Sequence, residues 1–85
     1  LAQAEFRDPA HPTYQVVADF KRGCQERIRT LAEQAEARDP SRLADDLSIV
    51  IEGAIAARSY LGEARAADAL RRSGAALIAA ALPKG

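Results

Sequence analysis

The sequence lacks most of the residues that identify a functional class. It has no methionine or tryptophan, only two tyrosines and two phenylalanines, and a single cysteine, Cys24. One cysteine excludes an internal disulfide, which fits a reducing cytoplasm. No apolar run approaches the roughly 18 residues of a membrane span and no signal peptide is evident, so we expect no membrane contact. Because even an initiator methionine is absent, we interpret the chain as an excised part of a longer protein.

The charges are balanced and the large apolar side chains are few. Twelve basic and twelve acidic residues cancel, whereas DNA-binding domains usually carry a basic patch. Twenty of the 85 residues are alanine, which favours helix but adds little apolar area. We therefore expect one domain over residues 1–85, built from closely packed helices that need a partner subunit.

The spacing of apolar residues predicts an all-α fold of three antiparallel helices, at about 12–37, 40–60 and 63–82. Pro12 and Pro40 suit first helical positions, Asp39 suits an N-cap, and Gly62 suits a left-handed cap. The helix 12–37 carries one apolar stripe: Val17, Phe20, Cys24, Ile28, Leu31 and Ala35.

The helix 40–60 carries two adjacent stripes. The first is Leu43, Leu47, Val50, Ala54 and Ala57, and the second is Ala44, Ile51, Ile55 and Arg58. A helix that is apolar over more than half of its circumference needs two packing partners. The helix 12–37 supplies one, and we expect a second subunit to supply the other. Small residues dominate the helix 63–82 and permit close helix approach.

Residues suited to catalysis are scarce. Nucleophile–base pairs, glycine-rich phosphate loops and metal-ligand clusters are absent from the sequence, so we expect no enzyme, no cofactor and no metal. His11 is a helix cap or a ligand contact, or else an ordinary turn residue, which we favour. Cys24 is an effector contact, a redox sensor or a small core residue, and we favour the core. Glu52 and Arg58 either line a ligand cavity or pair across a dimer, or are solvated.

Several segments in order resemble the C-terminal part of TetR/AcrR-family transcriptional regulators. They are Phe6–Pro12 followed by Lys21-Arg22, the turn Ala35–Pro40, the helix segments Leu43–Leu47 and Ile51–Ala54, and the alanine-rich Ala64–Ala81. Together they cover nearly the whole chain. Glu36 stands where the family usually has glycine, so we expect this helix end to be capped differently from the family pattern.

The resemblance implies a homodimer whose last two helices form a four-helix bundle with their symmetry mates. It also implies that the C-terminal body binds a small effector and that operator DNA is bound only through an N-terminal helix-turn-helix head, which this sequence does not contain. We expect a dimerisation and sensing domain with an apolar effector, in the cytoplasm. The alternative is a stand-alone helical interaction module; a helix-turn-helix in the upstream reading frame would distinguish the two.

These expectations assign two sets of residues. The predicted subunit interface is Leu47, Val50, Ile51, Ala54, Ile55, Arg58, Gly74, Leu77, Ile78 and Ala81. The candidate effector pocket is Phe20, Cys24, Ile28 and Glu52.

Overall fold

The computed structural model describes residues 11–83 and contains three α-helices in that range. They are α2 (Pro12–Gln34), α3 (Pro40–Leu61) and α4 (Glu63–Ala81). The predicted all-α fold of three helices is confirmed. Most of the segment Phe6–Pro12, which carries part of the family resemblance, lies outside the described residues.

The first helix begins at Pro12 as expected but ends earlier than expected. His11, which was favoured as an ordinary turn residue, caps this helix. His11 is the N-cap of α2, and its Nδ1 atom accepts a hydrogen bond from the Thr13 N–H at 3.1 Å. The helix ends at Gln34, not at residue 37, because Glu36 adopts a left-handed φ of 61°. The N–H of Glu36 donates to the Glu33 carbonyl and that of Ala37 to the Ala32 carbonyl, both at 3.0 Å. This is the Schellman pattern of helix termination, with glutamate where glycine is usual.

The turns that bound α3 follow the predicted pattern. Asp39 is the N-cap, with Oδ1 accepting from the Arg42 N–H at 3.2 Å, and Pro40 takes the first helical position. Gly62 separates α3 from α4 with φ 84° and ψ 161°. Its φ is positive as predicted. Its ψ, however, lies outside the left-handed helical region, in a region that only glycine adopts readily.

The loop between α2 and α3 holds the end of α4. The Arg38 N–H donates to the Ala81 carbonyl at 3.0 Å. Its guanidinium donates to the Ala80 carbonyl at 2.7 Å and to the Leu82 carbonyl at 3.4 Å. These carbonyls have no partners within the helix, so Arg38 caps the C-terminus of α4.

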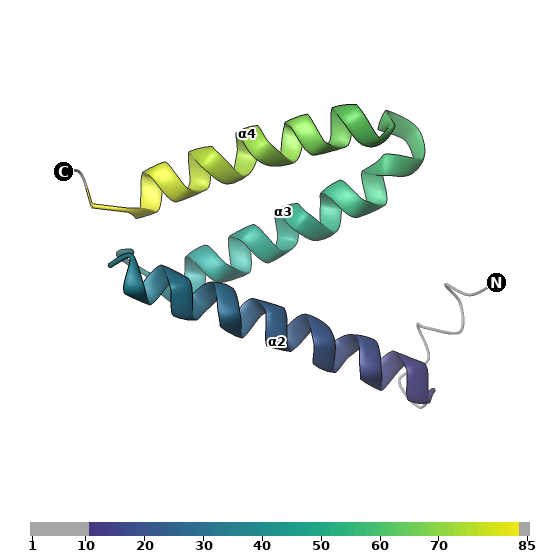
Figure 1. Cartoon of the computed structure of the whole chain (residues 1–85), viewed down its shortest axis with the longest axis horizontal. Helices are drawn as coiled ribbons and strands as arrows, with labels where there is room; N and C mark the ends of the chain where they lie inside the picture. Colours follow the sequence, from purple (N-terminus) through teal and green to yellow (C-terminus); the bar gives the residue numbers. More distant parts are fainter. Residues whose placement is uncertain (1–10, 84–85) are drawn as a thin grey trace.

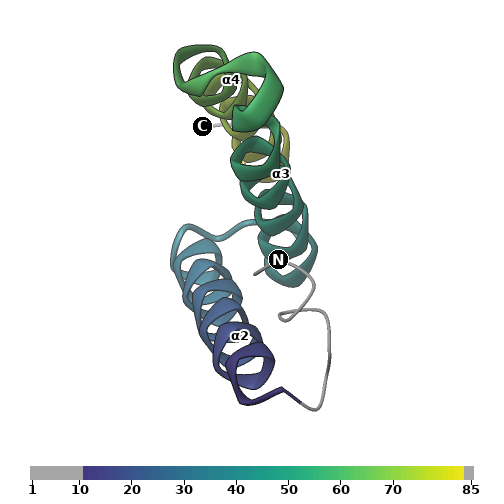
Figure 2. The ribbon, with the colours of Figure 1, turned by 90° about the vertical axis from the view of Figure 1, so that its right-hand side faces the viewer.

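The helices form one layer with α3 in the middle (Figures 1 and 2). α3 packs against both α2 and α4. α4 runs back along α3, whereas α2 and α3 diverge from their shared loop. The core lies where the ends of the three helices meet, and it is small. Its buried hydrophobic residues are Ala32, Ala37, Leu43 and Ala44, and Ala66 is buried apart from them, near the start of α4. Leu43 is the one large side chain among them, so a single layer of helices buries little apolar surface.

Candidate functional site

One side of the layer is apolar, and α3 forms its middle. Ile51 and Ile55 share a face of α3 with Leu47, because residues four apart lie on one side of a helix. Ile51 is 37% exposed and Ile55 is 53% exposed. Arg58, seven residues after Ile51, lies on the same side at the end of the helix.

The helix α4 contributes small residues to this side. Ala67, Gly74 and Ile78 recur at intervals of seven and four, and Ile78 is 40% exposed. Arg71, four residues after Ala67, is an exposed charged residue in this stripe and pairs with Asp68. A Cβ at Gly74 would lie 3.8 Å from Leu47 Cδ2, which is ordinary contact, so the α3–α4 contact itself does not require a glycine here. The glycine leaves the outer surface of α4 flat and open to another helix.

The helix α2 completes this side with the stripe Phe20, Cys24, Ile28 and Leu31. Ile28 and Leu31 line an open depression of about 220 Å³. All three helices contribute to its walls, which are formed by Ile28, Leu31, Ala32, Ala35, Leu43, Leu47, Ile78 and Leu82. Each of these residues has an apolar side chain. We call this side the apolar face, defined by Phe20, Cys24, Ile28 and Leu31 of α2, Leu47, Ile51 and Ile55 of α3, and Ala67, Gly74 and Ile78 of α4.

The opposite face of the layer is more polar. On α2 it carries Arg22, which pairs with Asp19, and Arg29, whose Nη1 lies 2.9 Å from Glu33 Oε2. Two large apolar side chains also lie on this face, both on α3. They are Ile49 and Tyr60, which are 72% and 77% exposed; they share a side of α3 with Gly53. A Cβ at Gly53 would meet nothing within 4 Å, so neither α2 nor α4 crosses α3 closely there.

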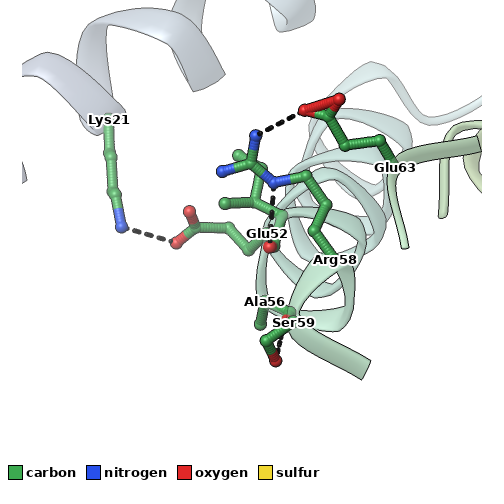
Figure 3. A pocket seen from close by; sticks show the side chains of 7 residues that line it. Lys21, Glu52, Ala56, Arg58, Ser59 and Glu63 are labelled. Atoms are coloured by element: carbon green, nitrogen blue, oxygen red, sulfur yellow. Dashed lines mark hydrogen bonds and ion pairs between the residues drawn. The ribbon is translucent and has the colours of Figure 1, made fainter. Parts of the chain in front are cut away.

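Charged side chains gather where α2 diverges from α3 (Figure 3). Lys21 Nζ of α2 reaches Glu52 Oε2 of α3 at 3.0 Å. Arg58 Nη1 lies 3.9 Å from Glu63 Oε1, and its Nε donates to the Ile55 carbonyl at 3.3 Å. These residues line an open cleft of about 720 Å³. All four charged side chains are about half exposed or more, so each pair is worth at most about 1 kcal/mol.

The structure divides the predicted interface residues into two groups. Six lie on or beside the apolar face: Leu47, Ile51, Ile55, Arg58, Gly74 and Ile78. The other four, Val50, Ala54, Leu77 and Ala81, lie in the seam between α3 and α4 and are partly buried within the chain. Helical spacing alone could not show whether these four residues pack within the chain or against a second subunit.

The predicted effector-pocket residues do not gather around one cavity. Phe20 and Cys24 are exposed, although Cys24 was favoured as a core residue. Ile28 lines the apolar depression, and Glu52 lines the charged cleft between α2 and α3. Three of the four therefore share the apolar face with the predicted interface residues. A short apolar stripe looks the same in sequence whether it faces the core, a ligand or a partner.

Two contacts between distant segments were not predicted. The Lys21–Glu52 ion pair joins residues 31 positions apart, and Arg38 reaches α4 across more than 40 positions. Neither has a local sequence signature, because both depend on the path of the turns.

The described residues show few features of other functional classes. Within 11–83, no three histidine, cysteine, aspartate or glutamate side chains are placed to share a metal ion. None of the described helices combines the length and the apolar character of a membrane span. Comparison with family models, curated proteins and solved structures finds no match.

Proposed function

We propose that this chain is a homodimerisation domain and that two copies pack through the apolar face. Following the sequence resemblance, we further propose that it is the dimerisation and effector-sensing part of a TetR-like regulator that acts in the cytoplasm. In that protein, operator DNA would be bound by a head outside these residues.

The observation that carries the dimer proposal is the single layer of helices. Stable domains usually bury the apolar stripes of their helices between at least two layers. In the described part of the chain, the apolar face has no second layer, and apart from Leu43 the buried hydrophobic residues there are all alanines. A second copy would add the missing layer and bury Ile51, Ile55 and Ile78 from both chains.

The apolar face is large enough for a stable dimer. The 22 residues of α3 and 19 of α4 give helices about 33 and 28 Å long. Two helices 8–10 Å apart present a surface about 20 Å wide. The resulting flat area of α3 and α4 is about 600 Å². The uneven surface of the side chains and the stripe of α2 add to this area, which brings it near the roughly 800 Å² per partner of a standard interface. The alternative partner, a different helical protein, would need to match this same face.

The regulatory part of the proposal rests on the resemblance. The alanine-rich α4 and the motifs along α3 have the order found in the family's last two helices, which form its dimer bundle. The expectation of a small, apolar effector rests on the resemblance and on the generally apolar composition of ligand pockets. A reading frame that continues upstream into a helix-turn-helix would support this part; an upstream sequence without one would favour the stand-alone module.

The test of the dimer uses two isoleucines of α3 that are two residues apart. At about 100° per residue, Ile49 and Ile51 point to opposite faces of the layer. We expect sedimentation equilibrium to give a dimer for the wild type and for Ile49→Glu. Ile51→Glu would place a carboxylate in the interface of each copy, and we expect it to weaken the dimer by on the order of 100-fold or more.

The proposed interface is wrong if both variants dimerise equally well, or if Ile49→Glu alone gives monomers. Circular dichroism of each variant checks that the helices remain. A wild type that stays monomeric at the highest concentration measured contradicts self-association altogether.

A further inference from the structure

Phe20 is a protruding aromatic side chain on the apolar face. It is 72% exposed and lies on the α2 stripe that continues to Ile28 and Leu31. Unlike tyrosine, phenylalanine has no hydroxyl group that could form a hydrogen bond with water. The ring therefore favours burial in an apolar site, and residues 11–83 do not bury it.

The apolar depression on the same face has the size and chemistry to receive such a ring. Its volume of about 220 Å³ exceeds the roughly 150 Å³ of a protein cavity that holds benzene. Since every lining side chain is apolar, an occupant with an unpaired polar group would be penalised there. A phenyl ring carries none.

We infer that Phe20 of each copy inserts into this depression of the other copy. The inference rests on the proposed dimer and adds its register, that is, which part of one copy lies opposite which part of the other. In a two-fold symmetric dimer each contact occurs twice, so both Phe20 rings are buried and both depressions are filled. The protrusion and the depression lie on one chain and on one face, which is the arrangement that a self-complementary interface needs.

This register places the two-fold axis. Phe20 precedes Ile28 and Leu31 by 8 and 11 residues, or about 12–17 Å along α2. For two layers packed face to face, the axis lies between them and crosses α2 midway, near Cys24. The contacts of Lys21 with Glu52 and of Gln25 with Asp45 show that the segment of α3 between Asp45 and Glu52 lies beside this point.

The same axis determines which residues meet their own mates. Since it crosses α2 near Cys24, the two Cys24 thiols would face each other on α2.

The first test compares two exposed aromatic residues by sedimentation equilibrium. Phe20→Ala should raise the dimer dissociation constant at least about 30-fold, as expected for a buried aromatic anchor. Tyr60→Ala is the matched control, because Tyr60 is 77% exposed on the opposite face. Phe20 does not contribute to the core, so its removal should leave the helical circular dichroism unchanged. Ala35→Phe, which fills the depression from its own wall, should weaken the dimer as well.

The second test uses the native cysteine. In the dimer, diamide should oxidise the two Cys24 thiols to a disulfide by taking up their two electrons and two protons. A covalent dimer would then appear on non-reducing electrophoresis. The control is Cys24→Ser combined with Ser73→Cys, which moves the thiol to a groove on the opposite face and should not cross-link.

The outcomes separate this register from the dimer itself. If Phe20→Ala dimerises like the wild type while Ile51→Glu is monomeric, the ring contact is wrong and the dimer stands. If Cys24 does not cross-link in a proven dimer, the axis is wrong. A third outcome concerns an anilinonaphthalene dye that binds one molecule per chain of the wild-type dimer and does not bind the Ala35→Phe variant. Such binding would show that the depression is open to ligands in the dimer, which also overturns the Phe20 contact. A monomeric wild type overturns both proposals.

Discussion

Replacing Gly62 with alanine tests whether the junction between α3 and α4 depends on glycine. At φ 84° and ψ 161°, an L-residue is strained by its own backbone. A Cβ at Gly62 would meet nothing within 4 Å, so no clash with neighbouring residues adds to this strain. The cost is therefore the conformational one, about 1–3 kcal/mol.

That cost is large for so small a protein. At about 0.05–0.15 kcal/mol per residue, 85 residues give a total stability of about 4–13 kcal/mol. A loss of about 2 kcal/mol would lower Tm by about 8–16 °C, at 4–8 °C per kcal/mol. Urea unfolding followed by circular dichroism measures the loss directly. One fixed protein concentration is required, because the stability of a dimer depends on it.

Gly53→Ala is the matched control for this prediction. Gly53 lies within α3 on the more polar face, and a Cβ there also meets nothing within 4 Å. Alanine is the better helix former by about 1 kcal/mol, so this variant should be more stable than the wild type. A Gly62→Ala protein within about 0.5 kcal/mol of the wild type would refute the argument from backbone strain. If both variants changed the free energy of unfolding equally, the loss of a glycine would explain the change and the backbone conformation of Gly62 would not.

Two further predictions concern the ends of the helices. Glu36→Gly should stabilise the protein by about 1 kcal/mol in urea unfolding, because the left-handed φ of 61° costs glutamate more than glycine; a destabilised variant contradicts the Schellman assignment. Arg38→Met should cost about 1 kcal/mol, because it removes the guanidinium bonds to the last carbonyls of α4. Arg72→Met, which removes a surface pair with Asp68, is the control and should cost less than about 0.5 kcal/mol. Equal losses for the two arginines would show that Arg38 has no special capping role.

Local chemistry made the helices predictable from sequence. A proline at the first position and a capping side chain mark the starts of α2 and α3, and Gly62 marks the end of α3. These signals act within a few residues, so they can be recognised along the chain. The end of α2 was placed three residues too late, because Glu36 does not look like a left-handed cap although it adopts that conformation.

The candidate site was only partly predictable. Helical spacing grouped Ile51 with Ile55, and Phe20 with Ile28, but it could not place the two stripes on one face. Only the turns around Ala37 and Gly62 decide how α2 and α4 are rotated about α3. Those turns bring the stripe assigned to an effector pocket and the stripe assigned to a dimer onto one surface.

The sequence by itself determined which segments are helical and which side of each helix is apolar, because both follow from contacts within one or two turns. Only the tertiary structure decided that the three helices form a single layer, that Arg38 caps α4, and that the stripes of α2 and α3 share one face. These features depend on contacts between residues far apart in the chain, and no local pattern encodes them.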